Sequence, residues 1–300
     1  MGREWKWEEA TAGAVAGVAT VVALHPLDIV RTRFQADDGR NRFVHQYKST
    51  ANALLTIART EGVKGLYAGL SPAVFGSSLA WGLYFLFYSN IKEMHQRRLG
   101  GELGPGHHLV ASAEAGALVS AMTNPIFLVK TRLQLQPPNG SQQPYSGFMD
   151  AFHSIRKVEG WRGFYKGFGP SVLLVSHGAL QFMAYEEGRK MAIAARKRVD
   201  PSATENSLTS LDFAVLGATS KLFALFLTYP YQVIRTRSQQ RPDSQGSLSY
   251  RGGWHAFTET LKYEGVRGLY KGMVPNLLRV APSSSITFIV YESVKKILLR

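Results

Sequence analysis

The sequence predicts an all-α membrane protein with six transmembrane helices, arranged in three parallel repeats around a pseudo-threefold axis. Windows without Asp, Glu, Lys or Arg, such as 68–91 and 167–185, approach the roughly 20 residues that a helix needs to cross a bilayer core. The stretch PLDIVRTRFQ from Pro26 recurs as PIFLVKTRLQ from Pro125 and PYQVIRTRSQ from Pro230. Such self-similarity at a long period indicates a repeated architecture.

Further matches keep the same register in each copy. A tyrosine is followed after fourteen residues by Glu-Gly, then after six by another tyrosine and after five by a proline. The Glu-Gly pairs begin at Glu61, Glu159 and Glu264. Each repeat is therefore expected to contain a long odd helix, a short amphipathic helix before Glu-Gly, and a long even helix. The repeats span 1–100, 101–205 and 206–300, with linkers at Gly100–Gly106 and Arg196–Ser207.

The composition is strongly basic and contains no cysteine. Lys and Arg number 35 against 21 acidic residues, a net charge of +14, which suits nucleic acid, anionic lipid or an anionic solute. A soluble nucleic-acid-binding protein would explain the charge but not the uncharged windows or the repeats. Without cysteine there is no disulfide, thiolate metal site or cysteine nucleophile. The N-terminus matches neither a secretory signal nor an Arg-rich transit peptide, so any targeting signal is expected to be internal.

The proline in each copy lies within a span, where it removes a backbone hydrogen bond and kinks the helix. Three kinks at one depth would swing three helix ends towards a common axis. Asp28 and Arg31 are three residues apart and therefore share a helix face. The pattern predicts that polar side chains beside the kinks close one end of a cavity.

Together, the threefold Pro-x-[acid]-x-x-[base]-x-[base], the Glu-Gly and the aromatic-[base]-Gly resemble the mitochondrial carrier family over essentially the whole chain. The resemblance implies a monomeric transporter, not an enzyme, with a central cavity, alternating access and the short amphipathic helices on the matrix side. We find no P-loop, His-Glu-x-x-His or Gly-x-Ser-x-Gly motif, and expect no cofactor, metal site or nucleic-acid partner.

By this resemblance, a matrix gate forms when the acid position of one odd helix pairs with the first base of the next. Asp28 and Lys130 would form an ion pair, and Gln232 would hydrogen-bond Arg31. Phe127 stands at the acid position of the second repeat and would offer its ring face to Arg235. Three glutamines would brace these contacts: Gln35, Gln134 and Gln239.

The resemblance also implies a cytosolic gate at the ends of the even helices. Two repeats match its aromatic-[acid]-x-x-[base] pattern in full: Tyr185, Glu186 and Arg189 in the second, and Tyr291, Glu292 and Lys295 in the third. The first repeat has Tyr88 and Lys92 but carries Ser89 at the acid position. The expected pairs are Glu186–Lys295 and Glu292–Lys92, which leaves Arg189 without a carboxylate.

The aromatic-[base]-Gly pattern precedes each even helix, and helix N-termini suit phosphates. By resemblance, cardiolipin would bind at Lys166 and Gly167, at Lys271 and Gly272, and at Gly69, where the base is missing.

Charged residues inside a span are costly and usually functional. Arg279 matches a substrate contact of the family, and the equivalent positions in the other repeats are Gly76 and Leu173. Lys221 and Glu114 are either further substrate-binding residues or a structural ion pair. Trp81 and His177 suit a planar heterocycle.

Several segments, among them NPIFLVKTRLQLQ, WGLYFLFY, SHGALQFMAYE and SSITFIVYE, resemble the folate carriers of this family, including the plastid type. The implied substrate is folate. FAD is a close alternative, followed by NAD or pyrimidine nucleotides, and a proton leak or scaffold is a distant one. The implied location is the mitochondrial inner membrane or the chloroplast inner envelope membrane.

Overall fold

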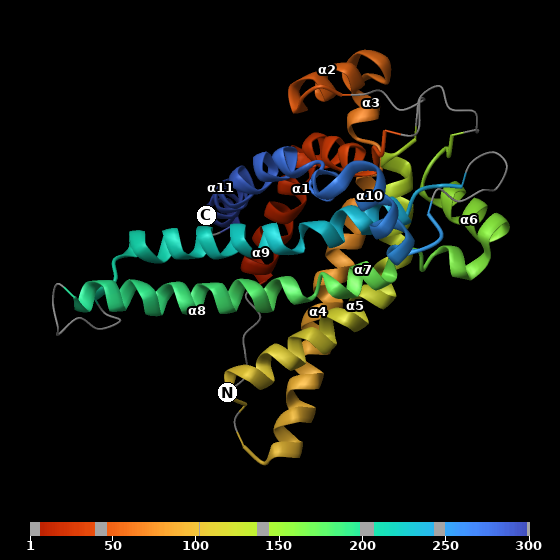
Figure 1. The fold of residues 1–300 in the computed structure, drawn as a ribbon. Coiled ribbons are helices and arrows are strands. Elements are labelled where there is room, and N and C mark those ends of the chain that lie inside the picture. Colours follow the sequence, from red (N-terminus) through yellow and green to blue (C-terminus); the bar gives the residue numbers. More distant parts are fainter. Residues whose placement is uncertain are drawn as a thin grey trace.

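The computed structural model describes residues 7–39, 47–101, 103–136, 144–198, 207–242 and 250–298, and their regular structure is entirely helical (Figure 1). Most of the linker predicted at Arg196–Ser207, and residue 102 of the one at Gly100–Gly106, lie outside these ranges. The first repeat holds α1 (Trp7–Ala36), α2 (Thr50–Thr60), α3 (Gly62–Leu66) and α4 (Leu70–Leu99). The second holds α5 (Pro105–Gln134), α6 (Phe148–Gly163), α7 (Phe168–Leu173) and α8 (Ser176–Lys197). The third holds α9 (Ser210–Ser238), α10 (Gly253–Gly268) and α11 (Met273–Leu298).

The fold class predicted from the sequence is confirmed, with one local difference in the second repeat. There the even helix is divided into α7 and α8, whereas α4 and α11 are continuous. Three described stretches, Thr11–Ala36, Gly62–Leu99 and Ser210–Ser238, are long and apolar enough to cross a membrane. The other long helices, α5, α8 and α11, carry charged residues along their length.

The three prolines lie inside the odd helices α1, α5 and α9. The residue before each proline ties its helix to the segment that leads into the even helix of the same repeat. His25 Nε2 is 3.0 Å from the Ala68 carbonyl oxygen. Asn124 donates to the Phe164 carbonyl at 2.6 Å, and the Tyr229 hydroxyl donates to the Lys271 carbonyl at 3.1 Å. These bonds fix where each even helix starts relative to the kink.

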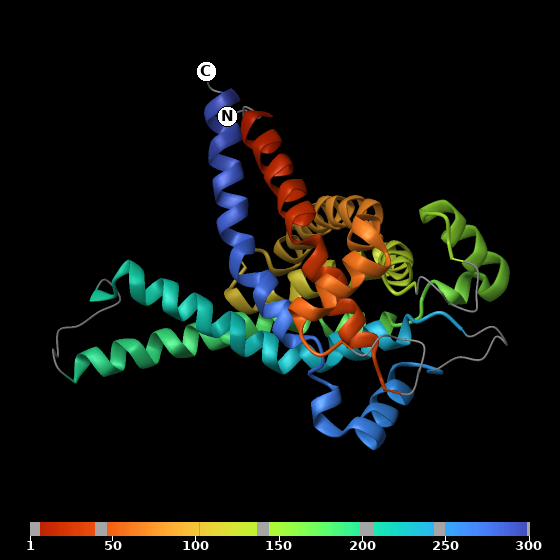
Figure 2. The ribbon, with the colours of Figure 1, turned by 90° about the horizontal axis from the view of Figure 1, so that it is seen from above.

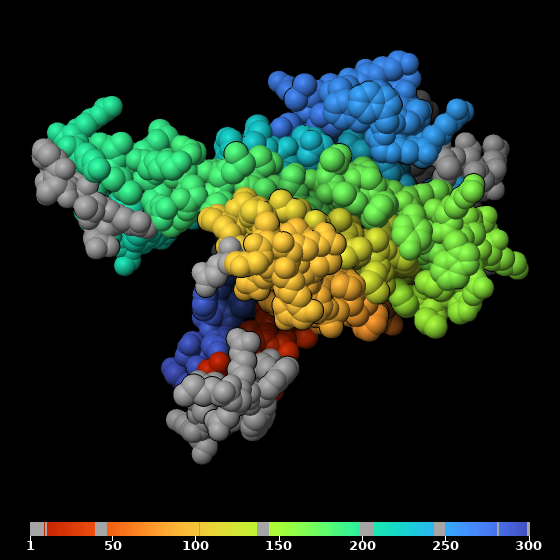
Figure 3. All heavy atoms as spheres, turned by 90° about the horizontal axis from the view of Figure 1, so that it is seen from below, coloured from red at the N-terminus to blue at the C-terminus, as the bar shows by residue number. Residues whose placement is uncertain are grey.

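The long helices associate in the pairs α1–α11, α4–α5 and α8–α9, each formed by helices of neighbouring repeats (Figures 1 and 2). The pairs meet where the odd helices are kinked, at the end that also carries α2, α6 and α10. From there they diverge, and the arm formed by α8 and α9 stands apart from the rest of the surface in Figure 3. We refer to the meeting point as the closed end and to the opposite side as the open end.

The core at the closed end is itself threefold. In each repeat the amphipathic helix α2, α6 or α10 packs on the last turns of α1, α5 or α9. The first such cluster contains Ile29, Val30, Ala53 and Ile57, all fully buried. The other two are built around Leu128 with Ile155 and around Ile234 with Ala256. Burial of these apolar side chains holds each amphipathic helix under its kink.

Candidate functional site

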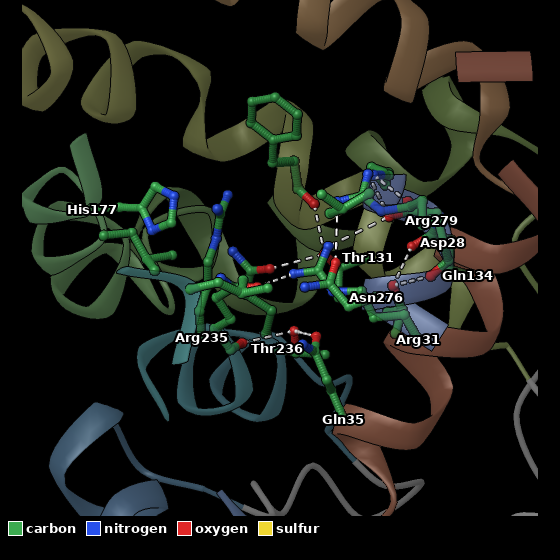
Figure 4. A pocket seen from close by; sticks show the side chains of 18 of the residues that line it. Asp28, Arg31, Gln35, Thr131, Gln134, His177, Arg235, Thr236, Asn276 and Arg279 are labelled. Carbon is green, nitrogen blue, oxygen red and sulfur yellow. Dashed lines mark hydrogen bonds and ion pairs between the residues drawn. The ribbon is translucent and has the colours of Figure 1, made fainter. Parts of the chain in front are cut away.

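A cavity of about 550 Å³ lies where the three kinked helices meet (Figure 4). Its walls come from α1, α5, α9 and α11, with two residues from around the start of α8. Among its lining residues one is acidic, Asp28, and five are basic: Arg31, Lys130, Lys221, Arg235 and Arg279. A cavity with this imbalance attracts anions.

Asp28 is the centre of a compact charged cluster. Lys130 Nζ lies 2.6 Å from its carboxylate, and Gln134 donates to the same group at 3.1 Å. Arg31 and Arg279 each place a guanidinium nitrogen 3.7 Å from the other carboxylate oxygen. The buried carboxylate is therefore surrounded by three cations contributed by α1, α5 and α11. Each of them has Asp28 as an ion-pair partner, although one carboxylate cannot neutralise three positive charges.

The two other positions of the motif are brought together with different chemistry. Arg31 donates from Nη2 to the Gln232 side-chain carbonyl. The Arg235 guanidinium lies over the Phe127 ring, 5.6 Å from its centroid. One ion pair, one hydrogen bond and one cation–π contact therefore occupy equivalent places in the three interfaces between odd helices. Sequence reasoning anticipated all three contacts.

A ring of threonine–glutamine bonds lies beside these contacts. The Thr32 hydroxyl donates to Gln134, Thr131 to Gln239 and Thr236 to Gln35, each at 2.9 Å. Every bond joins one odd helix to the next. Sequence analysis assigned no role to the threonines, although their place directly after the first base of each motif was a usable signal.

A second unassigned ring uses the last base of each motif. Arg33 binds Glu61 with two nitrogens, and its Nε donates to the Gln134 carbonyl at 3.1 Å. Arg132 and Arg237 repeat this arrangement with the Glu-Gly glutamates of their own repeats and the glutamine carbonyl of the next odd helix. Each arginine thus joins its amphipathic helix to its own odd helix and to the neighbouring repeat.

Two glutamates of this ring, Glu159 and Glu264, are held as anions. Burial raises the pKa of Glu159, but hydrogen bonds from Arg132 and Lys166 outweigh burial and leave the pKa below its ordinary value. The pKa of Glu264 is lowered in the same way, by Arg237 and Lys271 against burial. The charged form therefore contributes to stability near neutral pH.

Three of the predicted substrate contacts line the cavity: Arg279, Lys221 and His177. Arg279 also donates to Asn276 at 3.3 Å. His177 hydrogen-bonds Thr228 at 2.9 Å, which ties the start of α8 to α9. Lys221 is exposed in the cavity wall, and among the described residues it has no ion-pair partner.

The other predicted contacts lie elsewhere. Gly76 is buried where α4 approaches α5, and a Cβ there would come within 3.0 Å of Ile126, so this glycine serves helix packing rather than leaving space for substrate. Leu173 lies just before the break between α7 and α8, and its neighbour Leu174 lines the cavity instead. Trp81 is exposed and stacks on Phe85, away from the cavity lining.

The proposed pairing of Lys221 with Glu114 is wrong for this structure. Glu114 instead lies 3.1 Å from His95 Nε2, across the α4–α5 contact. The two residues belong to different arms, because Glu114 is on α5 and Lys221 is on α9, and these arms diverge towards the open end (Figure 1).

Comparison with known sequences identifies the repeats. The family model described as "Mitochondrial carrier protein" matches the chain three times, at residues 3–99, 101–195 and 206–300. The chain belongs to the mitochondrial carrier family. Over 300 residues it is 56% identical to "Folate transporter 1, chloroplastic" of Arabidopsis thaliana, covering 99% of this chain and 97% of that protein. It is 36% identical to "Nicotinamide adenine dinucleotide transporter 2, mitochondrial" of the same plant, covering 94% and 77%. It is 35% identical to "Mitochondrial nicotinamide adenine dinucleotide transporter 1" of Saccharomyces cerevisiae, covering 94% and 75%.

Within this carrier, the pairs expected for the cytosolic gate are not formed among the described residues. Glu186 pairs with Arg189 of its own helix at 2.6 Å, so Arg189 does not lack a carboxylate. Lys295 lies 3.5 Å from Glu9 and over the Tyr291 ring. The even helices diverge at the open end, which keeps Glu186 from Lys295 and Glu292 from Lys92 (Figure 2).

The glycines expected at the carrier's lipid sites have a structural role of their own. Gly69, Gly167 and Gly272 have φ angles of 75°, 75° and 81°, which favour glycine. A Cβ at each would lie 2.9–3.1 Å from a carbonyl oxygen of an odd helix. The neighbouring lysines, Lys166 and Lys271, are bound to Glu159 and Glu264. Cardiolipin binding at these positions stays a prediction.

Proposed function

We propose that this carrier moves folates across an organelle inner membrane by alternating access. The observation that carries the proposal is the 56% identity, along essentially the full length of both chains, to a protein named as a folate transporter. The chloroplastic name of that relative favours the chloroplast inner envelope over the mitochondrial inner membrane. The chemistry of the cavity supports the assignment independently. Folate combines a planar heterocycle with a tail of two carboxylates, and the cavity offers five cations against one carboxylate.

A second candidate is transport of a dinucleotide. The relatives named as NAD transporters share 35–36% identity with this chain, and a cavity rich in cations would also hold phosphates. FAD remains an alternative from the sequence motifs.

We further propose that the contacts around Asp28, Gln232 and Phe127 act as the matrix-side gate. Each joins two odd helices beside a kink, and together they occupy all three interfaces between odd helices. For the cavity to open on this side, Lys130 must leave Asp28, and Arg31 must leave Gln232. The number and strength of these contacts would therefore govern how often the gate opens.

Uptake by proteoliposomes tests the proposed function. The purified carrier is reconstituted, and uptake of radiolabelled folate is compared with uptake of FAD, NAD and UTP, with protein-free liposomes as the control. We expect folate to accumulate above the control and unlabelled folate to compete better than the nucleotides. Uptake of FAD or NAD without folate would contradict the folate assignment, and no uptake of any solute would favour a leak or scaffold.

A further inference from the structure

The cations on one side of the cavity share a carboxylate partner, whereas Arg235 on the other side has none among the described residues. Asp28 lies within 3.7 Å of Lys130, Arg31 and Arg279. Arg235 also lines the cavity, but among the described residues it has no carboxylate partner, and its charged group faces the Phe127 ring. In Figure 4, Arg235 and His177 lie at one side of the cavity, and Asp28 and Arg279 lie at the other.

The pseudo-threefold symmetry shows what is missing beside Arg235. Where Asp28 meets Lys130, the brace Gln134 donates its amide to the same carboxylate at 3.1 Å. At the equivalent interface Phe127 replaces the aspartate, Arg235 replaces the lysine and Gln239 replaces the brace. The Gln239 amide nitrogen is buried and has no hydrogen-bond partner. Arg235 and the Gln239 amide are therefore the two hydrogen-bond donors of a carboxylate site from which the carboxylate is missing.

We propose that Arg235 receives an anionic group of the substrate, and that Phe127 keeps this arginine available by offering it a ring in place of a carboxylate. The inference rests on the proposed function, because it assigns a residue to one end of the proposed substrate. The ligand group is a carboxylate, as on the tail of a folate, or a phosphate. The bound group takes the place of the carboxylate missing from the interface between Phe127 and Arg235.

The physical basis is the difference between two kinds of contact. A guanidinium is attracted only modestly by a ring face, whereas a carboxylate or phosphate binds its planar fork through two charge-assisted hydrogen bonds. An entering anion can therefore displace the ring contact. By contrast, it would have to compete with the Asp28 carboxylate for Lys130, Arg31 or Arg279.

Lys221 is too distant to share the same anionic group. It lies on α9 fourteen residues before Arg235, about 21 Å along a helix that rises 1.5 Å per residue. Fourteen residues are nearly four turns, so the two cations project on similar sides of α9, and both line the cavity. Lys221 is placed to meet a different part of an extended substrate.

A charge introduced at Phe127 tests the proposal in the purified, full-length protein. Folate affinity is measured by isothermal titration calorimetry for wild type, Phe127→Asp and the uncharged, similarly sized Phe127→Asn. We expect Phe127→Asp to bind folate at least tenfold more weakly than Phe127→Asn, because the new carboxylate occupies Arg235. Equal affinities, or tighter binding by Phe127→Asp, would overturn the proposal and leave Arg235 as a gate residue only.

A second measurement does not depend on the aspartate variant folding. Wild type and Arg235→Gln are titrated with folate and with folate diamide, in which both carboxylates are capped. The preference of wild type for folate should fall at least tenfold in Arg235→Gln, whereas an unchanged preference would refute the role of Arg235. If wild type binds FAD or NAD and not folate, the folate assignment fails, and the Asp–Asn comparison is repeated with that nucleotide. If it binds none of them, both proposals fail.

Discussion

Gln232→Glu should strengthen the closed end. In the structure Arg31 donates to the Gln232 side-chain carbonyl, and its side chain is 17% exposed. Glutamate would place a full charge at the same position. At about 3 Å and an effective dielectric constant of about 20, the gross attraction is about 5.5 kcal/mol. Desolvation of the new carboxylate and its repulsion by Asp28 offset most of this, which leaves a net gain of about 1–2 kcal/mol.

A gain of this size changes the ratio of the two gate states by about 5- to 30-fold. The state closed on the matrix side becomes more populated, and transport slows if opening of that side limits turnover. Labelling of a single cysteine measures the ratio directly, since the chain has no native cysteine. Ser283→Cys suits the purpose because Ser283 lines the cavity, and a membrane-impermeant maleimide reaches it only from the side that is open.

Two controls isolate the new ion pair. Gln232→Met keeps the length of the side chain but removes the acceptor, so it should shift the labelling ratio in the opposite direction. Arg31→Gln combined with Gln232→Glu removes the cation and should abolish the gain. An unchanged labelling ratio in Gln232→Glu, or a shift towards the matrix-open state, would show that these contacts do not govern the gate.

Three further outcomes follow from the same contacts. Lys221→Met should weaken substrate binding with little loss of thermal stability, because the lysine has no ion-pair partner within the described part of the chain. Lys130→Met should instead destabilise by about 3 kcal/mol, because it removes the nearest partner of a buried carboxylate. Equal melting temperatures of the two variants would contradict this. Gly272→Ala should destabilise the protein by about 1–3 kcal/mol, since the φ of Gly272 is 81° and the new Cβ would lie 2.9 Å from a carbonyl oxygen. Gly217→Ala is the control. It should not lower the melting temperature, because a Cβ at Gly217 would have no neighbouring atom within 4 Å. The pKa of Glu159 is lowered in the folded protein, so its carboxylate contributes stability that is fully present above the unfolded-state pKa of about 4.3 and is lost as the pH falls through the folded-state pKa. The difference in unfolding free energy between wild type and Glu159→Gln should therefore become smaller in acid. A difference that stays constant with pH would argue against this linkage.

The sequence by itself determined the repeats, the position of the kinks and the partners at the closed end. Asp28 with Lys130, Arg31 with Gln232 and Phe127 with Arg235 could all be paired from the sequence. The resemblance to the carrier family implied that the acid position of one odd helix meets the first base of the next, and the three copies in one register supplied the residues. The second base of the motif was not paired in this way. Its partner in Glu-Gly lies 27 or 28 residues away, towards the end of the amphipathic segment, and spacing alone does not bring the two together.

Only the tertiary structure decided which residues face the cavity and which contacts at the open end are made. Gly76 was expected beside the substrate, but the close approach of α4 and α5 buries it against Ile126. Glu186 and Lys295 were expected to meet, but their helices belong to different arms of the molecule. Near the kinks the helices converge, so register along the chain fixes the contacts. Away from the kinks the distance between helices depends on how the arms pack against each other, and that distance is a property of the whole fold rather than of any repeat.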